Sequence, residues 1–159
     1  MVKVGVLTIS DLGSQGKRQD TAGPAIEERI SAQGWQVVCR EIIPDEKERI
    51  SNTLRQWADT DKVHLILTTG GTGFATRDVT PEATSAVLEK QTPGLSEAMR
   101  AAGMQKTPHA MLSRGTAGIR GRSLIINLPG SKKGAVESLG AVMAALPHAI
   151  DVILDKPGH

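Results

Sequence analysis

Short apolar runs alternate with segments of helical periodicity along most of the chain, and this alternation limits the possible folds more than any other feature. The apolar, β-branched runs cover residues 2–10, 35–43 and 63–69, and the helical patterns cover residues 22–33, 46–58, 81–90 and 93–103. Apolar strands separated by helices are typical of a largely parallel sheet with helices on both faces. The sequence therefore predicts an α/β fold with three layers, α/β/α, around a mostly parallel central sheet. A chain of 159 residues fits a single domain over 1–159.

The carboxy-terminal part of the chain continues this pattern less regularly. Residues 109–118 and 122–128 are expected to be two extended segments joined by a short turn. Ser131 is expected to cap a long final helix, and Pro147 should interrupt that helix near residue 146, because proline lacks an amide hydrogen. Thr80, which is followed by proline, is expected to cap an earlier helix.

Composition and the first residues argue against several classes of protein. Cys39 is the only cysteine, so the chain forms no internal disulfide. The start of the chain lacks the zones of a signal peptide, and no apolar run is expected to approach the length of a membrane span, so we expect a cytoplasmic protein without a membrane partner. One Phe, two Trp and no Tyr leave few side chains for base stacking, which argues against nucleic acid as a partner.

Basic residues are concentrated in one segment of a chain whose net charge is only +2. From Lys106 to Lys133 there are six basic residues and no acidic residue. Two interpretations fit this segment equally well: a solvated surface, or a surface that binds anions.

A glycine-rich turn follows the third predicted strand and reads Gly70, Gly71, Thr72 and Gly73. Open α/β sheets bind their ligands at the carboxyl ends of the strands. Glycine lets the backbone approach an anion and adopt a positive φ. A tight structural turn is the alternative, but three glycines in four residues favour a ligand-binding loop.

Two familiar nucleotide motifs are excluded. The stretch DLGSQGKRQ fails as a P-loop, because Asp11 and Arg18 occupy positions that need glycine and Ser or Thr. The stretch GTGFAT fails as a dinucleotide fingerprint, because Thr76 occupies the last glycine position. A nicotinamide or flavin enzyme is therefore not expected.

A second loop of the same construction follows the segment 122–128. Pro129 and Gly130 precede Ser131, and Lys132 and Lys133 fall in the first turn of the expected helix. Lysines at a helix amino terminus oppose the helix dipole, yet they are well placed to neutralise a phosphate. We therefore expect a second anion-binding loop here.

Two aspartates follow predicted strands or the glycine turn. Asp45 comes after the second strand, in IIPDE, and Asp78 comes after the turn, in TRDVTPEAT. In a parallel sheet both are expected at the same edge, where two carboxylates beside two anion-binding loops suit Mg²⁺ bound together with substrate phosphates. Taken singly, each aspartate could equally be a turn or capping residue.

The motifs LTISD, IIPDE, LILTTGGTGFATRDVTPEAT, TPGLSEAMR, MLSRGTAGIRG and LIINLPGS together make the chain resemble the molybdopterin adenylyltransferase family over nearly its whole length. The resemblance implies a Mg²⁺-dependent transfer of AMP from ATP to the terminal phosphate of molybdopterin, with release of pyrophosphate. By position, Asp45 and Asp78 match the functional aspartates of the family and Ser113 matches a binding serine. The glycine turn and the loop from Pro129 to Lys132 match its substrate-binding loops.

The resemblance also implies a homotrimer and possible contact with a molybdenum-insertion protein. The stretch LPGSKKGA departs from the Pro-Gly-Asn-Pro or Pro-Gln-Pro that relatives often carry, so the contacts of Ser131 and Lys132 stay open. Two alternatives to the transferase remain: an early-pathway molybdopterin-binding protein of the same fold, and a noncatalytic trimeric binding or scaffold module.

Overall fold

The computed structural model describes residues 1–158, which form a mixed sheet of six strands in the order β2-β1-β3-β6-β5-β4. The strands are β1 (Lys3–Ile9), β2 (Gln36–Ile43), β3 (Leu65–Thr69), β4 (Lys90–Gln91), β5 (Ala117–Arg120) and β6 (Ser123–Leu128). β1 pairs in parallel with β2 and β3, and β3 pairs in parallel with β6. The antiparallel pairs lie at one side of the sheet, where β5 pairs with β6 and β4 pairs with β5. The mostly parallel sheet predicted from the sequence is confirmed.

The order of the strands in the sheet changes direction at β1. The chain passes from β1 outward to β2 and then returns to the other side of β1 as β3. The carboxyl ends of β1, β2, β3 and β6 therefore meet at one edge of the sheet, with a crevice between β1 and β3. A crevice of this kind, at the reversal of strand order, is where open α/β sheets bind ligands.

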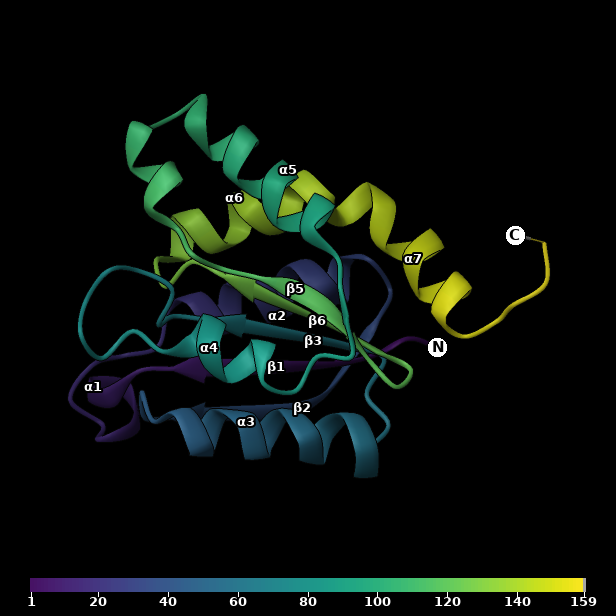
Figure 1. Ribbon diagram of the computed structural model, residues 1–159, viewed down its shortest axis with the longest axis horizontal. Helices are drawn as coiled ribbons and strands as arrows, with labels where there is room; N and C mark the ends of the chain where they lie inside the picture. Colours follow the sequence, from purple (N-terminus) through teal and green to yellow (C-terminus); the bar gives the residue numbers. More distant parts are fainter. Residues whose placement is uncertain (159) are drawn as a thin grey trace.

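Helices cover both faces of the sheet, so the three predicted layers are present (Figure 1). α3 lies on one face with α4, and α5, α6 and α7 lie on the other with α2. The helices are α1 (Asp11–Ser14), α2 (Ala22–Ala32), α3 (Lys47–Arg55), α4 (Thr80–Ser85), α5 (Pro93–Met104), α6 (Lys132–Val142) and α7 (Leu146–Ile153). Shorter turns are η1 (Gln56–Thr60), η2 (Pro108–Leu112) and η3 (Met143–Ala145).

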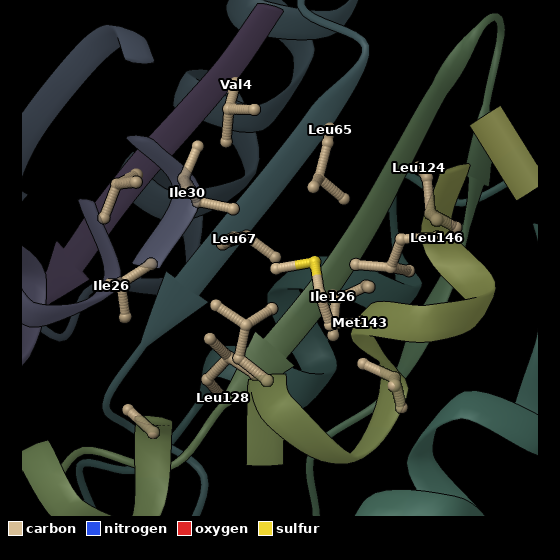
Figure 2. Close-up of a cluster of buried hydrophobic side chains, with 14 of the residues drawn as sticks. Val4, Ile26, Ile30, Leu65, Leu67, Leu124, Ile126, Leu128, Met143 and Leu146 are labelled. Carbon is tan, nitrogen blue, oxygen red and sulfur yellow. The ribbon is translucent and has the colours of Figure 1, made fainter. Parts of the chain in front are cut away.

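Each face of the sheet has its own apolar core. On the first face, Ile26 and Ile30 of α2 pack with Leu67, Ile126 and other strand residues (Figure 2). On the second face, α3, η1 and α4 pack against the opposite side chains of the same strands. Strands buried on both faces explain why β1, β3 and β6 are almost continuously apolar.

Three local predictions were wrong. Residues 108–112 form the turn η2 instead of an extended segment, because the Thr107 side chain accepts a hydrogen bond from the His109 amide and Pro108 suits a first helical position. The helix predicted over 81–90 ends at Ser85. Thr80 does not cap α4 with its side chain, which donates to the Gly70 carbonyl instead.

The carboxy-terminal helices contradict the expectation that no apolar run approaches the length of a membrane span. Lys132–Ile153 is a helical segment of 22 residues with mean hydropathy 1.4, long and apolar enough by length and composition to cross a membrane. Some of its apolar side chains nevertheless belong to the first core, where Leu139, Leu146 and Ile150 are at most 1% exposed, whereas Val152 is 47% exposed. The predicted interruption near residue 146 is confirmed, because η3 separates α6 from α7 there.

Candidate functional site

Two cavities open at the carboxyl edge of the sheet and meet there. The larger one, of about 720 Å³, runs between the glycine turn, α5, η2 and α6. The smaller one, of about 420 Å³, lies in the crevice between β1 and β3, beside the residues that lead into α2. Both are lined by Gly71, Asp78, Gly130 and Ser131. The two predicted loops therefore form the boundary between the cavities.

The glycines of the first loop are required by backbone conformation and close approach. Gly70 and Gly71 have φ values of +105° and +70°. A Cβ atom on Gly70 would lie 2.3 Å from the Ile9 carbonyl oxygen, and one on Gly71 would lie 2.2 Å from Thr80 Oγ1. The structural-turn interpretation therefore holds for both residues, and the turn brings their backbone to the cavity wall.

Hydrogen bonds join the two loops to each other and to α4. Thr69 Oγ1 donates to the Pro129 carbonyl at 2.6 Å, and the Gly70 amide donates to the Leu128 carbonyl at 3.3 Å. Thr80 Oγ1 donates to the Gly70 carbonyl at 2.9 Å. The loops after β3 and β6 are thus held as one unit.

Asp45 lies in the loop after β2 and is fixed by Asp11, the first residue of α1. The Asp11 amide donates to Asp45 Oδ2 at 2.8 Å, and the Asp45 amide donates to Asp11 Oδ1 at 3.0 Å. Burial raises the pKa of Asp45, and the negative charges of Asp11 and Asp78 act in the same direction. Asp45 is therefore a carboxylate whose charge a bound cation would stabilise.

Asp78 lies against the glycine turn from the other side. Its Oδ2 accepts a hydrogen bond from the Ala75 amide at 2.9 Å, and a Cβ atom on Gly73 would lie 2.9 Å from the same oxygen. A Cβ atom on Gly71 would in turn lie 3.1 Å from Asp45 Oδ1. The glycines thus leave room for Asp78 at the boundary of the cavities and for Asp45 in the smaller cavity beside it, at the edge of the sheet where the sequence predicted both.

The donor set fits a hard cation. Oδ1 of Asp45 and Oδ1 of Asp78 accept no hydrogen bond within residues 1–158, so each carboxylate has an oxygen free for a metal. Residues 1–158 contain no group of three or more His, Cys, Asp or Glu side chains that could hold a metal without further ligands. Mg²⁺ commonly takes one or two carboxylates and completes its coordination with water and substrate phosphates, and this arrangement suits it.

Arg77 joins the loop that carries Asp78 to the first residue of α1. Its Nε and Nη2 donate to Asp11 Oδ2 and Oδ1 at 3.0 and 2.8 Å. The hydrogen bonds from Arg77 hold the pKa of Asp11 below its usual range. Asp11 is thus the link between the loop that carries Asp45 and the loop that carries Asp78.

Ser113 and Thr72 line the larger cavity, as expected for substrate-binding residues. Arg100 of α5 donates to the carbonyl oxygens of Ser113 and Gly115 at 3.3 and 3.0 Å. Thr72 is buried and its carbonyl accepts a hydrogen bond from the Arg114 amide at 2.9 Å. These bonds fix one wall of the cavity beside the glycine turn.

The second loop combines a helix terminus with the cavity boundary. Pro129 lines the larger cavity, and Gly130 lies close to the first loop, since a Cβ atom there would be 3.3 Å from Gly70 Cα. Ser131 caps α6 as predicted, accepting a hydrogen bond from the Gly134 amide at 3.1 Å. Lys132 is exposed and is not among the residues that line either cavity, so its proposed contact with a ligand stays a prediction.

Most basic residues between positions 106 and 133 have partners within the protein. Arg114 pairs with Glu82, Arg120 pairs with Asp59, and Lys106 pairs with Glu137. Arg122 donates to the Leu154 carbonyl. These partners account for four of the six basic residues, and an anion-binding surface over this segment stays a prediction.

Sequence reasoning missed two residues that organise the site. Asp11 follows β1 just as Asp45 follows β2, so the same argument from strand ends would have found it. Arg114 donates mainly to carbonyl oxygens of distant loops, and no spacing in the sequence signals such contacts.

Known proteins are similar to the chain over nearly its whole length. Residues 5–148 match the family model described as "Probable molybdopterin binding domain". The chain is 44% identical over 155 residues to the molybdopterin adenylyltransferase of Helicobacter pylori, covering 96% of this chain and 88% of that protein. It is 47% identical over 156 residues to the molybdenum cofactor synthesis protein cinnamon of Drosophila melanogaster, covering 97% of this chain. The chain spans only 26% of the length of this Drosophila protein.

Two solved structures have the same architecture. The molybdopterin biosynthesis enzyme MoaB of Thermus thermophilus superposes with a TM-score of 0.94 at 54% identity, covering 99% of both chains. A structure of MogA superposes with a TM-score of 0.90 at 37% identity, covering 95% of this chain and 99% of that one.

Proposed function

The chain belongs to the molybdopterin-binding domain family, and from this premise we propose that it is a molybdopterin adenylyltransferase, which transfers AMP from ATP to molybdopterin and releases pyrophosphate. One observation carries the proposal: two cavities, each large enough for an organic ligand, meet at Asp78 beside Asp45. A reaction that joins two phosphate-bearing molecules needs two adjacent sites with their reacting ends at a common boundary.

The boundary residues suit phosphate chemistry. Gly71 and Gly130 lie there without side chains, so phosphates from both cavities can approach each other closely. The amino terminus of α6, at Ser131, adds the positive end of a helix dipole to the same place. These features would position the terminal phosphate of molybdopterin for attack on the α-phosphorus of ATP, with pyrophosphate as the leaving group.

The site supports direct transfer without a covalent enzyme intermediate. Cys39, the single thiol, lies on β2 away from both cavities, and burial raises the pKa of that thiol. The four boundary residues include no cysteine or histidine. Asp45 and Asp78 would hold Mg²⁺, which supplies neutralisation of the phosphate charges when bound. Transfer then depends on positioning and charge.

The proposal is tested by incubating the protein with molybdopterin, ATP and MgCl₂ and measuring adenylylated pterin and pyrophosphate. We expect both products in equal amounts, and neither in the presence of EDTA. Asp78→Asn serves as the matched control, since it retains the shape of the side chain and loses its charge. Tight binding of molybdopterin without any AMP transfer would refute the transferase.

A second candidate, the early-pathway molybdopterin-binding protein of the same fold, has a specific observation in its favour. Identity to the Thermus thermophilus MoaB structure is 54%, against 37% for the MogA structure. The same assay separates the early-pathway binding protein from the transferase, because a binding protein or scaffold retains pterin and leaves ATP unchanged. A homotrimer remains our expectation for the assembly and is tested by light scattering after gel filtration. Contact with a molybdenum-insertion protein and cytoplasmic location remain predictions.

A further inference from the structure

The loop between Gly71 and α4 carries Asp78 yet has little packing of its own. Residues 74–77 are exposed, and Phe74 is 71% exposed. Within the loop, the Asp78 amide donates to the Ala75 carbonyl at 3.0 Å, and the Ala75 amide donates to Asp78 Oδ2 at 2.9 Å. A local turn of this size does not by itself fix a backbone in water, because it buries no apolar surface.

Arg114 contacts this loop at both of its ends. Its amide donates to the Thr72 carbonyl at 2.9 Å, and its Nε donates to the Gly73 carbonyl at 2.9 Å. Nη2 donates to the Asp78 carbonyl at 2.9 Å. Nη1 and Nη2 also donate to the Glu82 carboxylate at 2.6 and 3.2 Å, which ties the loop to α4.

We propose that Arg114 is the positioning residue for Asp78 in the transfer reaction. This inference rests on the proposed function and adds a residue to it. The guanidinium binds the main-chain carbonyl of Asp78 and makes no bond to its carboxylate, whose Oδ1 remains available to a cation. A basic residue paired with the carboxylate itself would compete with the metal, as Arg77 would at Asp11. Arg114 therefore fixes the position of Asp78 without neutralising it.

The planar guanidinium explains why arginine is needed. It presents five N–H donors in a fixed geometry and can serve two carbonyls and a carboxylate at once. A lysine at this position keeps the positive charge but supplies a single mobile ammonium. Arg114→Lys thus separates charge from positioning.

Arg120 offers a matched control on the same sheet. Its Nε and Nη2 donate to the Asp59 carboxylate at 3.0 and 2.8 Å, and its Nη1 donates to the Val87 carbonyl at 3.0 Å. Arg120 ends β5 beside the turn into β6, at the edge of the sheet opposite the cavities. Arg120→Lys removes the same kinds of bond from a place where no substrate is proposed to bind.

The experiment compares wild type, Arg114→Lys and Arg120→Lys as full chains. We measure amide hydrogen exchange of residues 73–78, Mg²⁺–ATP affinity by calorimetry, and the Mg²⁺ concentration for half-maximal AMP transfer. Arg114→Lys should exchange faster at Ala75 and Asp78 and should weaken Mg²⁺–ATP binding or transfer by about 10–100-fold, a typical loss for groups that orient metal ligands. The KM for molybdopterin should change less. Arg120→Lys should match wild type in all three measurements.

Several results would overturn the inference. One is loop exchange that does not change in Arg114→Lys. Another is faster exchange accompanied by the Mg²⁺ dependence and Mg²⁺–ATP affinity of wild type, which would give Arg114 a purely structural role. If wild type binds Mg²⁺–ATP but transfers no AMP, the proposed function fails, and exchange and affinity still decide the role of Arg114. A wild type that binds no Mg²⁺–ATP refutes both. Should Arg114→Lys not fold, Glu82→Gln loosens the same contact and should give a smaller effect of the same sign.

Discussion

At the scale of single residues, Asp45 lowers the stability of the fold by its position and is proposed to bind the metal. Burial and two neighbouring carboxylates raise its pKa, so the ionised side chain is less stable in the metal-free folded state than in the unfolded chain. Active sites commonly accept such costs because the charged group is needed for the reaction. The structure therefore predicts opposite effects of one substitution on stability and on turnover.

Asp45→Asn should lower AMP transfer on the order of 100-fold or more, because metal binding is worth several kcal/mol. In EDTA at pH 7 its melting temperature should equal or exceed that of wild type. The sign follows from the raised pKa: stability of the metal-free wild type falls as pH rises through it, whereas asparagine does not titrate. Asparagine can still accept the Asp11 amide hydrogen bond. Calorimetry measures the melting temperature and the transfer assay measures the loss of turnover. A clear drop in melting temperature would contradict the electrostatic argument.

At the scale of elements, two glycines in neighbouring helices should respond oppositely to alanine. Gly140 is exposed in α6 with open space around its Cβ position, so Gly140→Ala should stabilise the protein by about 0.5–1 kcal/mol through helix propensity. A Cβ atom on Gly103 of α5 would lie 2.8 Å from Ala110 Cβ. Gly103→Ala should therefore destabilise by about 1–3 kcal/mol, because η2 must move away from α5.

Urea denaturation of the two variants measures this difference directly. Both Gly103 and Ala110 line the larger cavity, so Gly103→Ala should also weaken molybdopterin binding while Gly140→Ala leaves it unchanged. Equal changes in stability for the two substitutions would show that the α5–η2 contact is not tight.

The elements that could be predicted from sequence are those whose signal is local. The strands β1, β3 and β6 were found because burial on two faces produces apolar runs, and α6 was found through its Ser131 cap. β4 has only two residues, Lys90 and Gln91, both exposed, and it exists because it pairs with β5. The same division applies to the site: Asp45 and Asp78 follow from strand ends, whereas the backbone contacts of Arg114 do not appear in any pattern.

At the scale of the whole molecule, acid stability should depend on a buried ion pair beside the smaller cavity. The Asp20 side chain is 7% exposed and is paired with Arg40. Burial alone would raise the pKa of Asp20, but hydrogen bonds from the Gly23 amide, the Thr8 hydroxyl and Arg40 lower it overall. Because the folded pKa lies below the unfolded value, this stabilisation is present above the ordinary aspartate pKa of 3.8 and is lost as pH falls through the folded pKa.

Asp20→Asn should therefore cost about 1–3 kcal/mol at pH 7, the usual worth of hydrogen bonds to a charged group. The difference from wild type should shrink steadily below pH 4 as Asp20 becomes protonated in the wild type. Urea unfolding at pH 7 and pH 3 provides the comparison. A difference that is independent of pH would mean that shape rather than charge sets the contribution of Asp20.

The position of β6 in the middle of the sheet has a consequence for synthesis on the ribosome. Leu65 of β3 pairs on one side with Val4 and on the other with Leu124. One of the two pairing partners of β3 is therefore synthesised about 60 residues after it. Until β6, α6 and α7 have left the exit tunnel, the apolar side chains of β1 and β3 on that face lack most of their covering layer. A nascent chain of this topology exposes apolar surface until late in translation, and such surface favours aggregation during that interval.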